Sequence, residues 1–451
     1  MFTILFFLIV GALIFLFYRR PRAGLYLVVA CAPFLGLTLD FSAWGWSRNL
    51  PLLGNTDGPL ADFLALLLLA TVVFKEITRR GWKNFWRETR LLLGKTGFCY
   101  LLPFWLVALL SLTAVPRELL GTSFKYFLRP IVFFYLAWVA LPFFITDAEK
   151  TFKKLLATFL GVGFAASLLG WLSLLSNETF WPVWRRLAPT GWGKFAPLTY
   201  NHNILAEVLV AVIPLAFWFF ESSLKNKKNQ KLFFLLFAFI SLTALLTFSR
   251  AAWLALFFEF ILYFWFRRRT SFLKTAAPLS LKTISKKIAA AILLLSPFII
   301  YMIIFSLSSV VTSSNTARWD MTRVSWTYFQ EHPWLGNGIG TFVPLLADTR
   351  LFTVEYGDPL DAHGIIQKLL AEVGLLGIIS FFIYAGWALY SLRQEISQEK
   401  NEERKKLKLA LFLAVAGCFV FQLFNTSYFN QHLWLPVGLA LAAKKIYGQK
   451  D

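Results

Sequence analysis

Long apolar segments recur along the chain, and they constrain the fold more than any other feature of the sequence. Most approach the roughly 20 residues that an α-helix needs to cross a bilayer, although the first two and the last are short. A membrane-spanning β-barrel would show short alternating segments instead. We therefore predict an all-α integral membrane protein with about 12 (12–13) transmembrane helices in a single polytopic domain, 1–451. The segments lie at 3–18, 23–39, 60–74, 96–115, 124–145, 155–175, 201–220, 232–248, 251–266, 288–311, 364–391, 408–424 and 432–443.

The composition agrees with this prediction. Charged residues make up 15% of the chain, against about 25% in soluble domains, and hydrophobic residues make up 58%. These values exclude a soluble enzyme, a disordered protein, a repeat solenoid and a disulfide scaffold. The three cysteines lie in apolar segments without metal-ligand spacing, so we expect them to be buried as small hydrophobic residues. They are Cys31, Cys99 and Cys418.

Basic residues divide the loops into two alternating sets. One set holds 33 of the 45 Lys and Arg residues, and the intervening loops hold 9. By the positive-inside rule the basic set faces the cytoplasm, so 312–363 is a large periplasmic loop between late transmembrane helices. Most of the formal net charge of +21 thus reflects the orientation of the protein in the membrane. Nucleic acid is therefore not an expected partner. The basic set comprises 19–22, 75–95, 147–154, 225–231, 267–287, 392–408 and the tail from residue 444.

The long outward loop contains most of the polar residues that face outward. Its pattern predicts a helix from Arg318 to Gln330, which Pro333 and the glycines that follow should end. The glycine series can either cradle a phosphate with backbone N–H groups or form a turn. No βαβ pattern surrounds it, so a dinucleotide site is not expected. The glycines are Gly336, Gly338 and Gly340.

Arg250 is an isolated cation in a short outward turn between two apolar segments. An arginine at membrane depth is costly unless it reaches a partner. One interpretation is a side chain that extends to the interface from a helix end. The other is a cation placed for the phosphate of a lipid headgroup, which guanidinium binds bidentately. The same two interpretations apply to Lys125 and Arg129, which lie one helical turn apart near the outward end of a span.

His363 begins a membrane helix at its outward end. On a regular helix, Gly374 and Gly377 lie on the same face as this histidine and allow close packing. Lys368 and Glu372 are spaced i,i+4 and can neutralise each other. Neighbouring arginines should lower the pKa of His363, leaving a neutral imidazole that can accept a proton. The alternative is an interfacial histidine with a structural hydrogen bond.

The other histidines carry weaker signals. His202, next to Asn201, starts a span and can contact a polar substrate, whereas His332 lies in a turn and His432 begins the last short segment. The four histidines have no paired metal-ligand spacing, so the sequence predicts no metal site.

Three elements in the region 245–380 resemble those of a known family. Arg250 to Leu254 matches the R-x3-L element of O-antigen ligases. His363 to Gly377 matches their H-[NSQ]-x9-G-x-x-G element, except that Gly364 replaces the amide or hydroxyl residue. Arg318, followed by the segment 332–340, resembles the family's arginine and its P-[LW]-x-G-x-G turn. The related O-antigen polymerases and protein O-oligosaccharyltransferases share this architecture.

The resemblance implies a fold similar to GT-C-type glycosyltransferases and an inverting, metal-independent transfer without a cofactor. The donor would be a glycan on undecaprenyl diphosphate, and the acceptor would be lipid A-core oligosaccharide. Membrane lipids would surround the protein. The enzyme would lie in the bacterial inner membrane as a multi-pass protein, with its active site facing the periplasm.

The resemblance also implies roles for individual residues. Arg250 and Arg318 would stabilise the diphosphate, and His363 would act as general base or would itself hold the diphosphate. We expect further substrate contacts to come from residues near the outward ends of the spans. These are Arg323, Arg129, Lys125, His202, Asn201 and Gly338, and outward tryptophans such as Trp319, Trp326 and Trp334 can stack on sugars or form an interfacial belt.

Three alternatives remain at this point. An O-antigen polymerase would use the same donor but a second lipid-linked repeat unit as acceptor. A lipid or solute transporter would place ionisable residues at mid-membrane depth and would show two repeated halves, and no repeat is seen. A structural membrane scaffold would leave Arg250 and His363 without a purpose.

Overall fold

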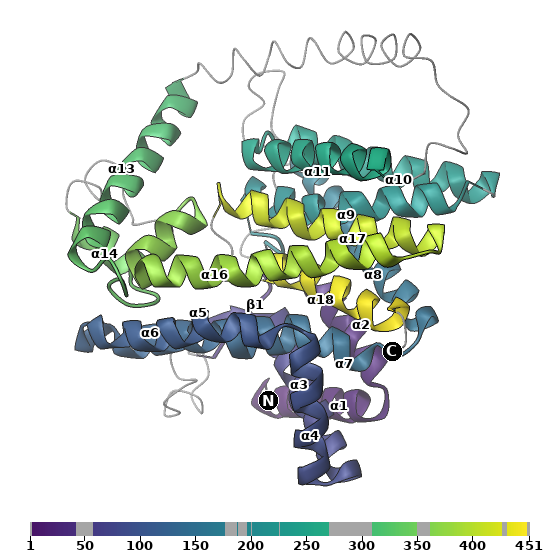
Figure 1. The fold of residues 1–451 in the computed structure, drawn as a ribbon, viewed down its shortest axis with the longest axis horizontal. Coiled ribbons are helices and arrows are strands. Elements are labelled where there is room, and N and C mark those ends of the chain that lie inside the picture. The colour runs from purple at the N-terminus through teal and green to yellow at the C-terminus, as the bar shows by residue number, and fades with distance from the viewer. Residues whose placement is uncertain are drawn as a thin grey trace.

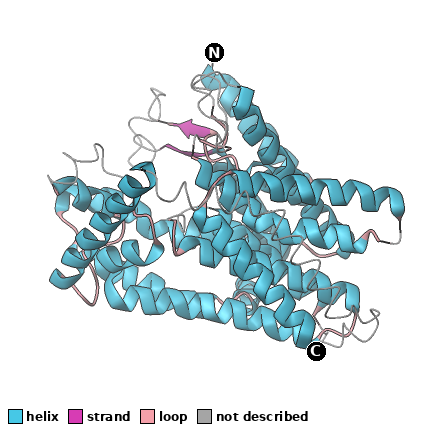
Figure 2. Ribbon diagram, turned by 90° about the horizontal axis from the view of Figure 1, so that it is seen from above, coloured by secondary structure: helices cyan, strands magenta, loops and turns pink. Residues whose placement is uncertain are grey.

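The computed structural model describes residues 2–41, 57–175, 187, 196–199, 201–224, 226–269, 309–349, 361–425 and 431–448. Across these residues the chain is almost wholly helical, as the apolar segments predict. The described strands β1 (Thr38–Asp40) and β2 (Asp57–Pro59) form one antiparallel pair. This small sheet lies near the N-terminus, where Phe6 contacts Phe41 with ring centroids 6.4 Å apart (Figure 2).

The central helices run side by side along the long axis of the molecule (Figure 1). Helices that follow one another in the chain, such as α9 and α10 or α16 and α17, run in opposite directions, as expected for successive membrane crossings. The helix α13 and the short α14 lie together at one end of the group. The central helices are α5 (Phe98–Ser111), α9 (His202–Ser222), α10 (Lys227–Leu246), α11 (Arg250–Arg269), α16 (Ile365–Gln398) and α17 (Glu402–Gln422), and the end pair is α13 (Ser309–Glu331) and α14 (Phe342–Asp348).

The remaining helices complete the bundle. A π-helical stretch, η3, joins α6 to α7 into one continuous apolar rod. The N-terminal helices pack against α8 and α3. These elements are α1 (Phe2–Arg19), α2 (Pro21–Cys31), α3 (Leu60–Arg80), α4 (Trp82–Lys95), η1 (Leu112–Ala114), η2 (Arg117–Leu119), α6 (Leu120–Leu128), η3 (Arg129–Ala140), α7 (Leu141–Ile145), α8 (Glu149–Leu172), η4 (Ser173–Leu175) and α18 (Gln431–Tyr447).

Five helices in the described part of the chain are long and apolar enough to cross a membrane by themselves. A sixth crossing arises if α4 and α5, which meet at a bend of 92°, are counted as one span. The protein is therefore a multi-pass membrane protein, and the count of about 12 spans stays a prediction. Most of the predicted segment 288–311 lies outside the described residues.

Two expectations about local structure need correction. The basic stretch 75–95 is helical, because α3 continues to Arg80 and α4 follows after Gly81. Charge marks this stretch as a loop between spans, yet its apolar residues recur at helical spacing. Cys99 is exposed on α5 and only Cys418 of the three cysteines is fully buried, so apolar surroundings in the sequence do not imply burial within the protein.

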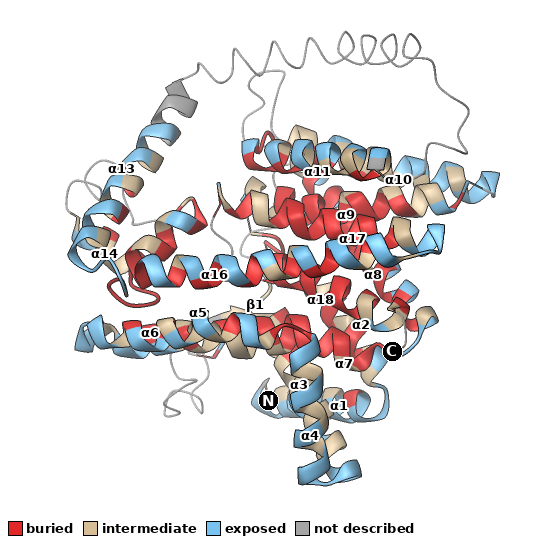
Figure 3. Cartoon of the chain, in the orientation of Figure 1, coloured by how far each residue is buried: buried red, intermediate tan, exposed pale blue. Residues whose placement is uncertain are grey.

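Burial divides the bundle into a core and a surface suited to lipid. Buried residues gather on α9, α17 and α18 (Figure 3). The neighbouring helices α10 and α11 expose large apolar side chains such as Leu235, Phe257 and Phe260. Apolar side chains on an outer helix face are stable only in a nonpolar solvent, which agrees with a membrane protein.

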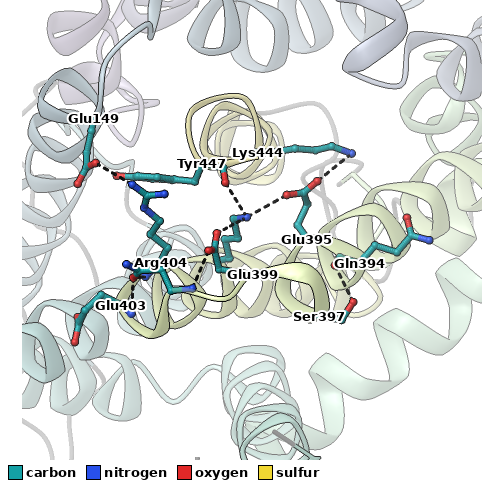
Figure 4. A network of polar contacts seen from close by, with 11 residues as sticks. Glu149, Gln394, Glu395, Ser397, Glu399, Glu403, Arg404, Lys444 and Tyr447 are labelled. Atoms are coloured by element: carbon teal, nitrogen blue, oxygen red, sulfur yellow. Dashed lines mark hydrogen bonds and ion pairs between the residues drawn. The ribbon is translucent and has the colours of Figure 1, made fainter. Parts of the chain in front are cut away.

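A network of ion pairs ties the helices together at the C-terminal end of α16 (Figure 4). This end lies away from α13 (Figure 1). Lys408 is almost fully buried, and its Nζ lies 2.8 Å from a carboxylate oxygen of Glu399 and 3.1 Å from one of Glu395. Lys444 of α18 also pairs with Glu395, at 3.7 Å. The network joins the C-terminal end of α16 to α17 and α18. The two ends of α16 therefore carry different chemistry, because His363 precedes the opposite end.

Candidate functional site

Local interactions fix Arg250 at the start of α11. Phe248 adopts a left-handed conformation (φ 53°) that ends the preceding helix, and its side chain is buried. Ser249 then caps α11, since its Oγ accepts a hydrogen bond from the Ala252 amide at 3.5 Å. The same Oγ donates to Oδ1 of Asn203 at 2.8 Å. The turn is thus held against the beginning of α9, and the origin of the arginine side chain is fixed.

Arg250 reaches across to α13. Its Nη2 donates a hydrogen bond of 2.9 Å to Oδ1 of Asn315. Asn315 lies one helical turn before Arg318, so both residues project from the same side of α13. Arg250 therefore has a specific partner in the protein. This contact argues against the interpretation that its side chain only extends to the membrane interface.

Arg318 lies on α13 and is half-buried, and its carbonyl accepts a bond from Gln367 of α16 at 3.4 Å. Its Nε is shielded from solvent and has no hydrogen-bond partner among the described residues. Burial, and then the nearby charge of Arg250, lower the pKa of this guanidinium, which still carries its charge. Gln367 of α16 holds α13 in place, since its Nε2 donates to the Thr322 hydroxyl at 2.5 Å. Arg250 and Arg318 are therefore close enough for their charges to interact, and Arg318 carries an unsatisfied donor.

His363 lies immediately before α16, next to the Gly364 cap. Burial lowers its pKa, the Arg318 charge lowers it further, and Asp361 opposes both effects. A neutral imidazole next to a guanidinium can accept a proton, as the sequence predicts. The structure thus brings Arg250, Arg318 and His363 into one cluster.

Gly364 is the position at which this chain departs from the family pattern, and the structure gives a reason for the glycine. A Cβ added at this position would lie 2.9 Å from the carbonyl oxygen of Leu423, just beyond the end of α17. That carbonyl occupies the space that an amide or hydroxyl side chain would need. The close approach of the chain after α17 is therefore the reason for glycine here.

α16 is not one regular helix, because it breaks at Gly374 (φ 62°, ψ −162°). The break frees backbone groups that the glycine-rich turn after α13 satisfies. The amides of Asn337 and Gly338 donate hydrogen bonds of 2.9 Å to the carbonyls of Ala371 and Glu372, respectively. In the other direction, the Leu375 amide donates a bond of 2.9 Å to the Pro333 carbonyl. The turn and the break form one backbone clamp.

The clamp corrects two expectations from the sequence. His363, Gly374 and Gly377 do not share a continuous helix face, because the helical phase is lost at Gly374. The amide of Gly338 is not available to a phosphate, because it already bonds to Glu372. The left-handed glycines at 336, 338 and 340 form a structural turn, which was the other interpretation of this series.

A buried ion pair reinforces the clamp. Lys368 and Glu372, 1% and 0% exposed, lie with Nζ and Oε1 3.5 Å apart. Lys368 also pairs with Asp361 at 2.5 Å, and Oε1 of Glu372 accepts a bond from the Phe342 amide at 3.2 Å. The predicted i,i+4 pair therefore also connects the segment before His363 to α14.

The remaining predicted substrate contacts lie around the cluster in different ways. The guanidinium of Arg129 stacks on Tyr126 at 4.9 Å, and Nζ of Lys368 lies 5.7 Å from the same ring. These residues, with the half-buried Lys125, border the clamp on the side of α6 and η3. No hydrogen bond or ion pair between Arg129 and the arginine cluster is found within the described ranges.

Arg323 faces away from the cluster. It lies five residues after Arg318, about 140° around the helix at 100° per residue. Its side chain is 81% exposed and pairs with Asp320 at 3.7 Å. The structure therefore gives Arg323 no place beside His363, although it does extend into the outward loop region.

At the start of α9, Asn201 serves as the helix cap and accepts a bond from the Asn203 amide at 2.9 Å. His202 is the first helical residue and is half-buried. Asn203, which bonds to Ser249 before Arg250, is the residue that links this segment to the cluster. The sequence prediction therefore named the right segment but missed its connecting residue.

Two further groups were missed. Asn315 could have been found from its i,i−3 spacing to Arg318. The second group lies one turn deeper, where Glu207 accepts a bond of 2.6 Å from Gln422 and lies 3.4 Å from Nδ1 of His432. Because these residues come from α9, α17 and α18, no local pattern reveals them.

In a comparison with protein families, residues 234–382 match the family described as O-Antigen ligase. This segment, about a third of the chain, contains Arg250, Arg318, His363 and the clamp. The predicted resemblance to the O-antigen ligase superfamily is confirmed. A search of curated proteins found no match.

Proposed function

We propose that the protein is a membrane glycosyltransferase that moves an O-antigen glycan from undecaprenyl diphosphate to the lipid A-core oligosaccharide. The observation that carries this proposal is the clustering of Arg250, Arg318 and His363 within the segment that matches O-antigen ligases. Two fixed cations suit a diphosphate leaving group, and a neutral imidazole suits a sugar hydroxyl.

In the proposed reaction, a hydroxyl of the acceptor sugar gives its proton to His363 while its oxygen attacks the anomeric carbon of the donor glycan. The bond between that carbon and the diphosphate oxygen breaks, and its electron pair leaves with undecaprenyl diphosphate. Attack from the face opposite the leaving group inverts the anomeric configuration. The reaction needs no metal in this scheme, because Arg250 and Arg318 stabilise the charge that develops on the diphosphate.

The lowered pKa of His363 in the ligand-free protein supports the general-base role. Burial and the Arg318 charge keep the imidazole neutral, and a neutral imidazole can accept the proton of the acceptor hydroxyl. The Arg250–Arg318 pair remains for the diphosphate.

The charge asymmetry of the loops supports a periplasmic site in the bacterial inner membrane. The basic stretch 392–408 and the basic tail from Lys444 adjoin the C-terminal end of α16, whereas His363 precedes its N-terminal end. The positive-inside rule assigns the C-terminal end to the cytoplasm. Trp319, Trp326 and Trp334 are exposed near the opposite end, so they suit contact with glycan.

The test is an acceptor assay with purified protein in nanodiscs. Lipid-linked glycan is offered together with lipid A-core and with a second lipid-linked repeat unit, in the presence of EDTA. We expect transfer to lipid A-core that EDTA does not reduce. Elongation of the lipid-linked unit alone would assign the protein as a polymerase. Loss of transfer in EDTA with recovery in Mg²⁺ would refute the metal-independent scheme.

A further inference from the structure

A large cavity lies at the end of the bundle opposite to His363. Its volume is about 1450 Å³, and it is lined by the α1–α2 junction, α3, α4, α5, the η3–α7 rod, α8 and the end of α18. Lys445, next to the ion-pair network of Figure 4, is one of its lining residues. The cavity therefore lies far from the proposed reaction.

The cavity has two chemically different parts. Its walls are apolar and come from several helices. Its rim carries cations from the α1–α2 junction, from the end of α3 and from the start of α8. Representative wall residues are Leu69, Val72, Leu93, Phe98, Ile131 and Phe144, and representative rim residues are Arg19, Arg20, Arg79, Lys150, Lys154 and Lys445.

The rim has an excess of positive charge. Nine basic residues line the cavity against three acidic ones. The acidic residues already have partners, because Asp147 pairs with Arg22 at 2.5 Å, and Glu76 and Glu88 both pair with Arg80. In the part of the chain that the structure describes, no ion pair involves Arg79, Lys150 or Lys154. This cationic excess favours the binding of an anion at the rim.

The helix α4 indicates that the rim lies at the membrane surface. It turns away from α5 by 92° and alternates basic residues with aromatic ones. Trp82 and Trp86 are exposed by 59% and 49%. Tryptophan together with basic residues on such a helix is typical of a segment that lies in the headgroup layer.

We propose that this cavity is a binding site for an anionic phospholipid of the cytoplasmic leaflet. Its phosphate headgroup lies among the rim cations, and its acyl chains lie along the apolar walls. The apolar lining favours a lipid over a free anion, and the cationic rim favours an anionic lipid over a zwitterionic one. The assignment to the cytoplasmic leaflet rests on the loop charges, and the site is independent of the glycan-transfer proposal.

The test uses the full-length protein in detergent and measures thermal unfolding with added phosphatidylglycerol, phosphatidylcholine or inorganic phosphate. We expect phosphatidylglycerol alone to raise the unfolding temperature. Native mass spectrometry should then show phosphatidylglycerol bound to the protein. A shift with inorganic phosphate of equal size would show an anion site without lipid selectivity and would overturn the proposal.

Two matched triple variants localise the site. R79Q/K150Q/K154Q removes rim cations, and we expect phosphatidylglycerol affinity to fall about 100-fold from the loss of three headgroup-level charges. K227Q/K228Q/K231Q removes exposed cations from α10 outside the cavity and should leave affinity unchanged. Equal losses in both variants would indicate general surface attraction and would overturn the proposal. If the first triple variant fails to fold, the single variant R79Q replaces it in the test. R79Q should bind phosphatidylglycerol more weakly than the wild-type protein does.

Discussion

Nη2 of Arg250 donates a hydrogen bond to Oδ1 of Asn315 over 2.9 Å, and this contact joins the start of α11 to a helix 65 residues later in the chain. Arg318 follows Asn315 by one turn of α13. The contact thus holds two guanidinium groups near each other, and Arg250 contributes to the lowered pKa of Arg318. Like charges at close range are unfavourable until an anion binds between them. The arrangement is suited to receive a diphosphate.

The first prediction concerns the chemistry of Arg250. Arg250→Ala should reduce kcat/KM for glycan transfer by about 10²–10³-fold, the range seen when one donor to a developing anion is lost. Arg250→Lys should recover only part of the activity, because lysine restores the charge without the bidentate geometry. Both effects are measured with lipid-linked donor and lipid A-core acceptor.

Arg117→Ala is the matched control for this prediction. Arg117 lies in η2, is exposed and belongs to the outward loops, yet it has no part in the arginine cluster. Its replacement should leave turnover close to wild type. If Arg117→Ala lost as much activity as Arg250→Ala, a diffuse outward charge would explain the effect, and the specific role of Arg250 would be abandoned.

The second prediction is a pH dependence. In the proposed reaction the neutral form of His363 is the base, so activity should fall as the pH drops through its pKa. Because burial and Arg318 lower that pKa, the acid limb of kcat/KM should lie below the ordinary histidine value of 6.5. His363→Ala should abolish transfer while the protein remains folded.

Two substitutions should move this acid limb in opposite directions. Arg318→Gln removes a neighbouring cation, so the pKa of His363 rises and the acid limb of the residual activity moves to higher pH. Asp361→Asn removes an anion, so the pKa falls and the limb moves to lower pH. Profiles that shift together, or not at all, would remove His363 from the titrating step.

The third prediction tests the buried pair of the clamp. Lys368→Ala leaves Glu372 uncompensated in the interior and should destabilise the protein by about 3–5 kcal/mol. The double variant K368M/E372Q should destabilise the protein by less than the sum of the two single changes. Each single variant leaves one buried charge unpaired, whereas the double variant removes both charges. Unfolding in detergent with added denaturant provides the measurement.

An exposed pair of the same spacing is the control for the buried one. Lys153 and Glu149 lie 2.7 Å apart with side chains 53% and 44% exposed. Lys153→Ala should change the unfolding free energy by about 1 kcal/mol or less. Equal losses for Lys153→Ala and Lys368→Ala would show that burial does not determine the strength of the Lys368 interaction.

The sequence predicted well the features that depend on composition and order. Long apolar segments predicted a helical membrane protein, and the order of Arg250, Arg318 and His363 predicted the family. The helix expected from Arg318 is present, although it begins earlier, at Ser309. These features could be predicted because hydrophobicity and short motifs are local properties of the chain.

Features that depend on distant backbone contacts could not be predicted. Gly374 fits a membrane helix as a small packing residue, and only the bond from Gly338 to Glu372 shows why the helix breaks nearby. Gly364 is likewise explained by the distant Leu423 carbonyl. A side-chain pattern cannot show which carbonyl will approach a glycine, so these positions remained unexplained until the fold was known.

The last prediction concerns the break in α16. Gly374 has a positive φ, and a Cβ there would lie 2.6 Å from the carbonyl carbon of Trp334. Gly374→Ala should therefore destabilise the protein by about 1–3 kcal/mol from backbone strain, before any clash is counted. Because the clamp positions α13 relative to α16, transfer activity should fall together with stability.

Gly386 provides the control within the same helix. A Cβ at Gly386 meets nothing within 4 Å, so Gly386→Ala should stabilise α16 by up to about 1 kcal/mol through helix propensity. The two variants should shift thermal unfolding in detergent in opposite directions. If Gly374→Ala instead unfolded at or above the wild-type temperature, α16 would tolerate a regular helix at this point. The clamp would then have no part in positioning Arg318 beside His363.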